Sequence, residues 1–126
     1  MADDDVVIYA STLQEDRTFG PAALVANVNT TLQDRHPSIS RDGLELFLAS
    51  TRPGGFGGLD LWVSTRGNNS APWSTPVNLG SPVNSAANEA GPAISTNGKL
   101  LYFQSFRPPD GLGAFDLYVT TRVAAQ

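Results

Sequence analysis

The sequence predicts an all-β protein made of repeated four-stranded antiparallel sheets. Three observations support this fold class. The chain matches itself at a shift of about 55 residues, a period typical of repeat architectures. Turn dipeptides of the Asp-Gly and Asn-Gly type separate short apolar runs at the same place in both copies. Finally, 12 Gly and 9 Pro punctuate the chain and no segment keeps a period of 3.6 residues, so we expect helices to be nearly absent.

The internal match extends over most of the chain. Pro37–Pro53 aligns with Pro92–Pro108 without a gap, and Asp60–Arg66 aligns with Asp116–Arg122 after a glycine-rich loop that is one residue longer in the second copy. Upstream, further short matches fit the same period: Val28-Asn29 with Val83-Asn84, Phe19 with Trp73, and Asp5–Ile8 with Asp60–Val63.

Each copy begins with a short strand and a tight turn. Ser38–Ser40 and Ala93–Ser95 place a single Ile between small residues, as a cramped strand requires. Asp42-Gly43 and Asn97-Gly98 follow, and both dipeptides accept positive φ at two successive residues. They predict type I′ hairpin turns.

Second and third strands follow in both copies, and an outer strand follows in the first copy. The runs Leu44–Ser50 and Leu100–Ser105 are apolar at nearly every position, which indicates second strands covered on both faces. Third strands, Leu61–Thr65 and Leu117–Thr121, are rich in β-branched and aromatic residues. We expect a broken outer strand over Trp73–Leu79, because Pro76 is tolerated at a sheet edge.

The repeated motif resembles that of TolB-like β-propellers: Pro-x-Ile-Ser-x-Asp/Asn-Gly, an apolar strand, Ser-x-Arg-Pro, a Gly-rich loop and Asp-Leu-Trp/Tyr-Val. The resemblance implies that each copy is one propeller blade. The chain then reads as a single β-propeller segment with about two blades: residues 1–36 a partial blade and linker, 37–91 a complete blade and linker, 92–126 a partial blade.

Two blades are too few to close a ring, since propellers have roughly 4 to 8. We expect the ring to be completed by oligomerisation, with a homotrimer giving about six blades, or by further blades of a longer chain. The strand-like segment Val6–Ala10 aligns with the third strand and is left over in either arrangement.

Composition narrows the function classes. The 126 residues suffice for one domain, and 8 basic against 12 acidic residues offer no cationic stripe for nucleic acid. No apolar run approaches the ~20 residues of a membrane span, and we expect no signal peptide behind Met1 because Asp3–Asp5 replaces a basic segment. The absence of Cys leaves the compartment open; the family resemblance implies a periplasmic or extracellular location.

Arg52 and Arg107 each precede an acidic residue, Asp60 or Asp116, across the Gly-rich loop. We expect bidentate ion pairs that pin this loop to the third strand. The alternative is that both guanidinium groups bind an anionic ligand.

Oxygen-rich side chains precede each first strand: Asn29 and Asp34 in one copy, Asn84 and Glu89 in the other. In a propeller this linker lies near the channel mouth, so ring closure would gather these groups, and Asp34 and Glu89 become candidate Ca²⁺ ligands. Alternatively, the two Asn side chains only cap turns. His36, the single histidine, is with Asp34 a candidate general base or metal ligand.

The aromatic residues at matched positions, Trp62 with Tyr118 and Phe19 with Trp73, predict packing between blades, or else a sugar-binding groove. Taken together, the sequence favours a non-catalytic binding or interaction module without a cofactor, whose ligand is a protein segment, glycan or small molecule. Two alternatives stay open: a hydrolase or lyase using Asp34, His36 and Glu89, and an architectural fragment of a larger propeller.

Overall fold

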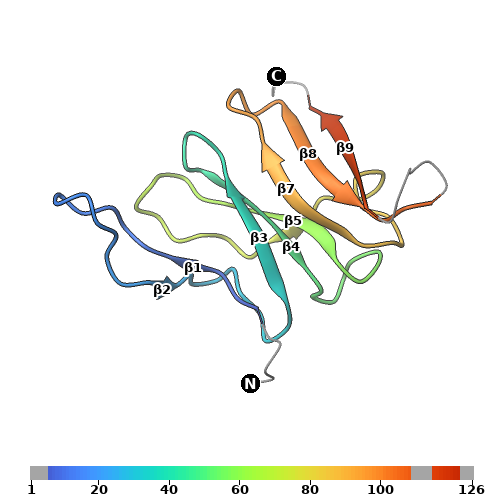
Figure 1. Cartoon of the computed structure of the whole chain (residues 1–126). Coiled ribbons are helices and arrows are strands. Elements are labelled where there is room, and N and C mark those ends of the chain that lie inside the picture. Colours follow the sequence, from blue (N-terminus) through green and yellow to red (C-terminus); the bar gives the residue numbers. More distant parts are fainter. Residues whose placement is uncertain (1–5, 109–114, 123–126) are drawn as a thin grey trace.

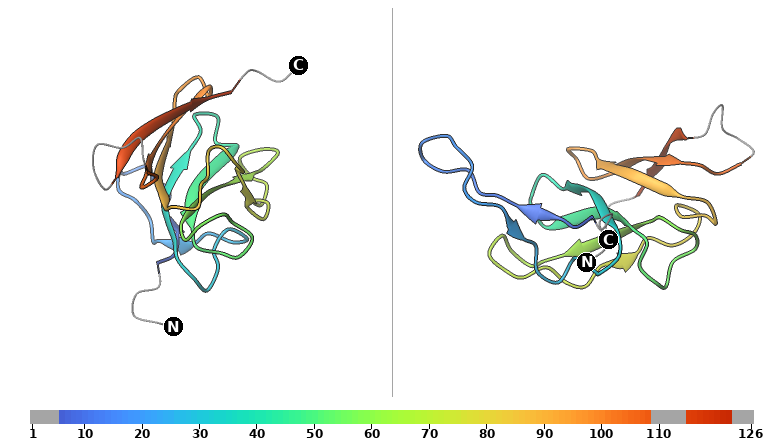
Figure 2. Two further views of the ribbon diagram at one scale, coloured as in Figure 1. Left: turned by 90° about the vertical axis from the view of Figure 1, so that its right-hand side faces the viewer. Right: turned by 60° about the horizontal axis from the view of Figure 1, so that its bottom comes forward.

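The fold is all-β, as the sequence predicts. A computed structural model describes residues 6–108 and 115–122, and these contain nine strands and no helix. The strands form three antiparallel sheets, and none of the three closes on itself: a two-stranded ribbon β1-β2, a central sheet β3-β4-β5-β6 and a C-terminal sheet β7-β8-β9. The central sheet lies between the other two (Figures 1 and 2).

In the central sheet the strand order follows the chain order. Its strands are β3 Asp34–Ile39, β4 Glu45–Ser50, β5 Asp60–Thr65 and β6 Val77–Asn78. The predicted second and third strands are confirmed, and β6 follows Pro76 at the sheet edge as expected. The first strand begins at Asp34, four residues before the predicted start, so the residues assigned to a linker belong to the sheet itself.

The C-terminal sheet contains β7 Glu89–Ile94, β8 Leu100–Ser105 and β9 Asp116–Thr121. Here too the first strand starts earlier than predicted, at Glu89. The ribbon pairs β1 Tyr9–Ala10 with β2 Ala23–Leu24. The leftover strand predicted over Val6–Ala10 is therefore paired within the chain through its last two residues.

The first strand of each larger sheet carries the same bulge. Between β3 and β4 the register shifts by one residue after Arg35, and between β7 and β8 after Ala90. At each bulge one residue has a left-handed backbone, with φ of 56° at His36 and 59° at Gly91. The bulges thus explain why a glycine stands at the second position.

The hairpin turns differ from the predicted type. Positive φ occurs at Gly43 and Gly98 but not at the preceding Asp42 or Asn97, so neither turn is type I′. The Gly43 N–H donates to the Ser40 carbonyl, and the Ser40 N–H donates to Glu45, which makes a four-residue loop closed by a left-handed glycine. The Asp42 carboxylate accepts bonds from the Ser40 hydroxyl (2.6 Å) and the Leu44 N–H (3.0 Å), which stabilises this wider loop.

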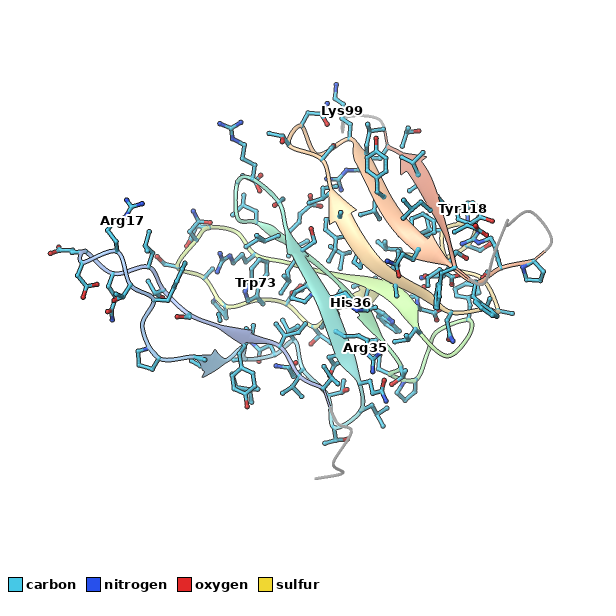
Figure 3. All side chains as sticks on the ribbon, in the orientation of Figure 1. Arg17, Arg35, His36, Trp73, Lys99 and Tyr118 are labelled. Carbon is cyan, nitrogen blue, oxygen red and sulfur yellow. The ribbon has the colours of Figure 1, made fainter. Side chains whose placement is uncertain are left out.

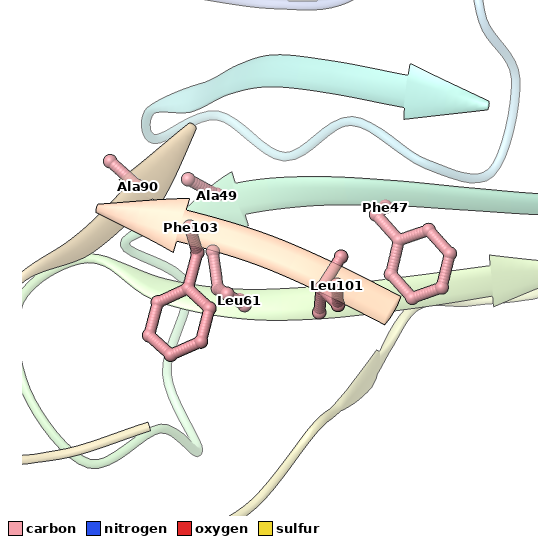
Figure 4. Packing of buried hydrophobic residues seen from close by; sticks show 6 residues of the cluster. All are labelled: Phe47, Ala49, Leu61, Ala90, Leu101 and Phe103. Carbon is pink, nitrogen blue, oxygen red and sulfur yellow. The ribbon is translucent and has the colours of Figure 1, made fainter. Parts of the chain in front are cut away.

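The core lies between the sheets, and β4 contributes to both of its halves. Phe47 and Ala49 point toward the C-terminal sheet and pack with Leu61, Leu101 and Phe103 (Figure 4). On the opposite face of β4, a second cluster faces the N-terminal ribbon; its buried members are Ile8, Val28, Leu46, Leu48 and Trp62.

The prediction of two covered faces is confirmed for β4 and wrong for β8. Every residue of β4 after Glu45 is buried, whereas Tyr102 and Gln104 of β8 are exposed. The reason is that no described segment covers the outer side of the C-terminal sheet.

Candidate functional site

In the central sheet a buried acidic side chain is hydrogen-bonded to the segment before β3, to the end of β4 and to the loop after β4. Asp34, at the start of β3, lies opposite Ser50 at the end of β4. Its Oδ1 accepts bonds from the Ser50 hydroxyl (2.7 Å) and from Arg52 Nη2 (2.9 Å), and its Oδ2 accepts from the N–H and hydroxyl of Thr30 (2.7 and 2.9 Å). Burial raises the pKa of Asp34, but the hydrogen bonds from Thr30, Ser50 and Arg52 outweigh it and hold the pKa below its ordinary value.

Glu89 takes the same place in the C-terminal sheet. Its carboxylate accepts bonds from the N–H and hydroxyl of Ser85 (2.9 and 2.6 Å) and from the Ser105 hydroxyl (2.8 Å). Arg107 lies 3.5 Å away, a looser ion pair than that of Arg52 with Asp34. Both arginines also donate to a linker carbonyl, Arg52 to Val28 and Arg107 to Val83.

The predicted partners of the arginines are therefore wrong. Arg52 pairs with Asp34 rather than Asp60, and Arg107 pairs with Glu89 rather than Asp116. Asp60 nevertheless fixes the glycine-rich loop, because its carboxylate accepts from the backbone N–H groups of Phe56 and Gly57. An anionic ligand at Arg52 would have to compete with the buried Asp34 carboxylate.

Asn29 and Asn84 do more than cap turns. The Leu61 N–H donates to Asn84 Oδ1 (2.7 Å), and Asn84 Nδ2 donates back to the Leu61 carbonyl (2.9 Å). Asn29 makes the same two bonds with the N–H and carbonyl of Ile8. Each amide thus bonds to both backbone groups of one residue as a neighbouring strand would. Both hydrogens of each Nδ2 are used, the second by the Val25 carbonyl in the case of Asn29 and by Asn78 Oδ1 in the case of Asn84.

This pairing also corrects the alignment of the N-terminal segment. Because Asn29 and Asn84 are matched residues, Ile8 occupies the place of Leu61, not the place of Val63. Asp5, on which that alignment began, lies outside the described residues. The alignment of the N-terminal segment with β5 therefore shifts by two residues from the predicted one, and Tyr9 becomes the counterpart of Trp62.

His36 lies at the β3 bulge beside Arg35 (Figure 3), on an open hollow of about 440 Å³ that is also lined by Asp34 and by Val6–Tyr9. Its Nδ1 accepts a bond of 3.3 Å from the Gly91 N–H. Burial, and then the charge of Arg35, lower the pKa of His36 and so favour the neutral ring. The structure thus brings Asp34 and His36 to one hollow, but both oxygens of Asp34 are already bonded.

Metal ligands do not gather among the residues described. No group of three or more His, Asp and Glu side chains suited to a metal ion is found within 6–108 and 115–122. Asp34 and Glu89 each sit in their own sheet, surrounded by hydroxyl, N–H and guanidinium donors. These groups donate hydrogen bonds to the carboxylates. A Ca²⁺ site would instead place several further oxygen ligands around the ion.

The matched aromatic residues pack inside the protein at three of the four positions. Trp62 belongs to the core cluster that faces the ribbon, and Tyr118 stacks on Phe103 with ring centroids 6.0 Å apart. Trp73 packs on the same cluster as Trp62, and the Arg66 guanidinium lies 4.1 Å from its ring centroid. Phe19 is exposed. These contacts support the packing interpretation rather than a sugar groove.

The outer face of the C-terminal sheet is exposed and apolar, a location that sequence reasoning did not give because it predicted cover on both faces of β8. Tyr102, Leu117 and Val119 share this face and are 46%, 78% and 52% exposed. Their counterparts in the central sheet are Phe47, Leu61 and Val63, of which Phe47 and Leu61 are buried against the C-terminal sheet and Val63 packs on the same cluster. The signal was present in the sequence, because matched strands must present matched faces.

Comparison with protein-family models, curated proteins and solved structures finds no match to this chain. Within the described ranges there is no helix with the length and apolar character needed to cross a membrane.

Proposed function

We propose that this protein is a non-catalytic interaction module built from propeller-type blades, which associates with further copies of itself through the outer face of β7-β8-β9. One observation carries the proposal. The face formed by Phe47, Leu61 and Val63 in the central sheet is covered by the next sheet, whereas the matched face with Leu117 and Val119 is open to solvent. A sheet of the same kind is the partner whose shape and chemistry already fit such a face within this chain.

Burial of the open face favours association. Complete burial of each large apolar side chain contributes about 1.5–3 kcal/mol, so covering Tyr102, Leu117 and Val119 stabilises an association by several kcal/mol before entropy costs. A head-to-tail contact of this kind leads to a closed ring if the rotation between copies closes. Three copies with two blades each would complete the expected ring.

The alternative of a hydrolase or lyase has less support. Asp34 and Glu89 are buried and bonded on both carboxylate oxygens, so neither is available as a general base. A general base must reach the proton that it removes. A module that binds through apolar surface needs none of these groups.

Light scattering after size-exclusion chromatography tests the proposal. We expect a discrete oligomer, with a trimer as the expected species, that dissociates in Leu117→Lys because a charge is then placed on the buried face. Val77→Lys is the matched control, since Val77 is also an exposed apolar residue (64% against 78% for Leu117) and lies on the outermost strand β6. A monomer across the accessible concentration range, or equal dissociation in both variants, contradicts self-association and favours the reading as part of a larger propeller.

A further inference from the structure

A small apolar hollow lies at the edge of β9, between the central and C-terminal sheets. It measures about 150 Å³ and is lined by residues of both sheets and of the linker that joins them, among them Phe47, Leu79, Val83, Leu101, Thr120 and Arg122. The volume is below the ~300 Å³ at which pockets for drug-sized ligands begin, and it suits a single side chain.

The hollow corresponds to a place that is filled in the central sheet. There, Trp73 and Val25 pack against the buried cluster that contains Val28 and Leu46, and the Arg66 guanidinium lies over the Trp73 ring. Leu79 is the structural counterpart of Val25, because its N–H donates to the Leu61 carbonyl as the Val25 N–H donates to the Ile8 carbonyl. Leu79 lines the hollow together with Val83, Leu101 and Arg122, which match Val28, Leu46 and Arg66. The empty hollow is therefore the seat that an aromatic side chain of a fourth strand would take in the C-terminal sheet.

Arg122 is already placed for such a ring. Its Nε donates to the Gly98 carbonyl (2.6 Å), as Arg66 Nε donates to Gly43 (2.8 Å). Two bonds to Glu45 (2.8 and 2.5 Å) fix the remaining guanidinium nitrogens. A guanidinium held flat by its neighbours loses little entropy when a ring stacks on it.

The strand edge beside the hollow also offers groups for pairing with a further strand. In the central sheet the Ser74 N–H donates to the Thr65 carbonyl (2.9 Å), the Thr65 N–H donates to Ser74 Oγ (3.0 Å), and Ser64 Oγ donates to the Ser74 carbonyl (2.5 Å). The matched groups belong to Thr120 and Thr121. Among the strands described, none pairs with the outer edge of β9.

We infer that the β9 edge is a docking site for an extended peptide segment with an aromatic side chain, bound by strand pairing at Thr121 and by insertion of the ring over Arg122. The occupant resembles Trp73–Leu79 in chemistry: an aromatic residue, a small hydroxyl residue after it, then an extended stretch. The inference does not depend on self-association through the outer face, because the hollow lies on the opposite side of the sheet.

Isothermal titration calorimetry with a capped synthetic peptide of the sequence 71–79 tests this site. We expect saturable binding to the full chain, and at least tenfold weaker binding of the same peptide with Trp replaced by Ala, since the ring supplies most of the buried area. Absence of binding, or equal affinity of both peptides, overturns the inference.

Protein variants locate the site. Thr120→Trp fills the hollow and should weaken binding at least tenfold; Arg122→Gln, which keeps a side-chain donor near Gly98 but removes the cation, should weaken it several-fold. Leu117→Lys lies on the other face and should bind as the wild type does, even if it dissociates the oligomer. If Thr120→Trp does not fold, amide chemical shifts decide: changes at Thr120–Arg122 support the site, and changes confined to Ser64–Arg66 show displacement of β6 and overturn it.

Discussion

Asn84 holds Leu61 by both backbone groups, donating through Nδ2 to the carbonyl at 2.9 Å and accepting through Oδ1 from the N–H at 2.7 Å. The Asn84 side chain thereby continues the hydrogen bonding along β5 beyond the point where the two-residue strand β6 ends. The same arrangement at Asn29 and Ile8 ties the N-terminal ribbon. In both places an amide side chain continues a sheet that the backbone leaves unfinished.

Asn84→Ala should lower the free energy of unfolding by about 1–3 kcal/mol, because the buried Leu61 N–H loses its partner. The Leu61 carbonyl loses one bond but still accepts from the Leu79 N–H. Asn29→Ala should cost less, since its bonds are only partly buried. Urea denaturation followed by circular dichroism measures both values. Asn68→Ala is the control: Asn68 accepts one exposed turn bond, and its loss should stay within about 0.5 kcal/mol. A loss for Asn84→Ala no larger than for Asn68→Ala would contradict the structural role.

The two ion pairs should differ in their contribution to stability. Arg52→Met leaves Asp34 with an uncompensated charge in a buried place, which we expect to cost about 3 kcal/mol. Arg107→Met should cost less, because the Arg107 to Glu89 pair is longer and its guanidinium more exposed. Adding Asp34→Asn to Arg52→Met should recover part of the loss, since it removes the stranded charge. The same denaturation series checks the order, and an equal loss in both single variants would show that exposure does not decide it.

Acid should destabilise the protein in part through Asp34. Its folded-state pKa is lower than the ordinary value of 3.8, so the folded state binds fewer protons in the interval between the two values. The stabilisation is complete above the unfolded pKa and is lost as the pH falls through the folded pKa. Asp34→Asn should therefore be less stable than the wild type at pH 7 and show a smaller further loss between about pH 5 and pH 2.

Asp42→Asn is the matched control for that pH series. The pKa of Asp42 is also lowered, first by the Ser40 hydroxyl and then by the Leu44 N–H, but the side chain is fully exposed. The second copy has Asn97 in this place and makes the same two bonds, to Ser95 and Lys99. We expect Asp42→Asn to change the free energy of unfolding little at any pH. A larger effect at Asp42 than at Asp34 would contradict the assignment of acid destabilisation to Asp34.

Strand positions could be predicted because apolar runs recur at a fixed spacing and each copy checks the other. The start of each first strand could not be predicted because it is polar. Asp34 has the character of a loop residue in the sequence, and its place in the strand follows only from its bonds to Ser50 and Arg52. The ion pairs were mispredicted for a related reason. Asp60 is closer to Arg52 in sequence, but antiparallel pairing of β3 with β4 brings Asp34 within 2.9 Å of the guanidinium.

The turn type and the open hollow lay beyond sequence reasoning. Asp42-Gly43 fits both a two-residue loop and a four-residue loop, and only the hydrogen bonds of Ser40 show which one forms. The hollow beside Arg122 appears only when the surroundings of Trp73 are compared in three dimensions.

His36→Gly should stabilise the protein by about 0.5–1 kcal/mol. His36 has φ of 56° at the β3 bulge, a left-handed conformation that costs a residue with a side chain about 1 kcal/mol or more, and the matched bulge uses Gly91 at φ 59°. The one bond that would be lost, from the Gly91 N–H to Nδ1, is long at 3.3 Å and exposed, so it offsets only part of this gain. Gly91→Ala makes the reverse change and should cost about 1 kcal/mol, with its Cβ 3.3 Å from the Gln104 side chain. Thermal and urea unfolding of both variants check the two signs. Destabilisation by His36→Gly would mean that the bond of the imidazole to the Gly91 N–H contributes more to stability than the left-handed backbone costs.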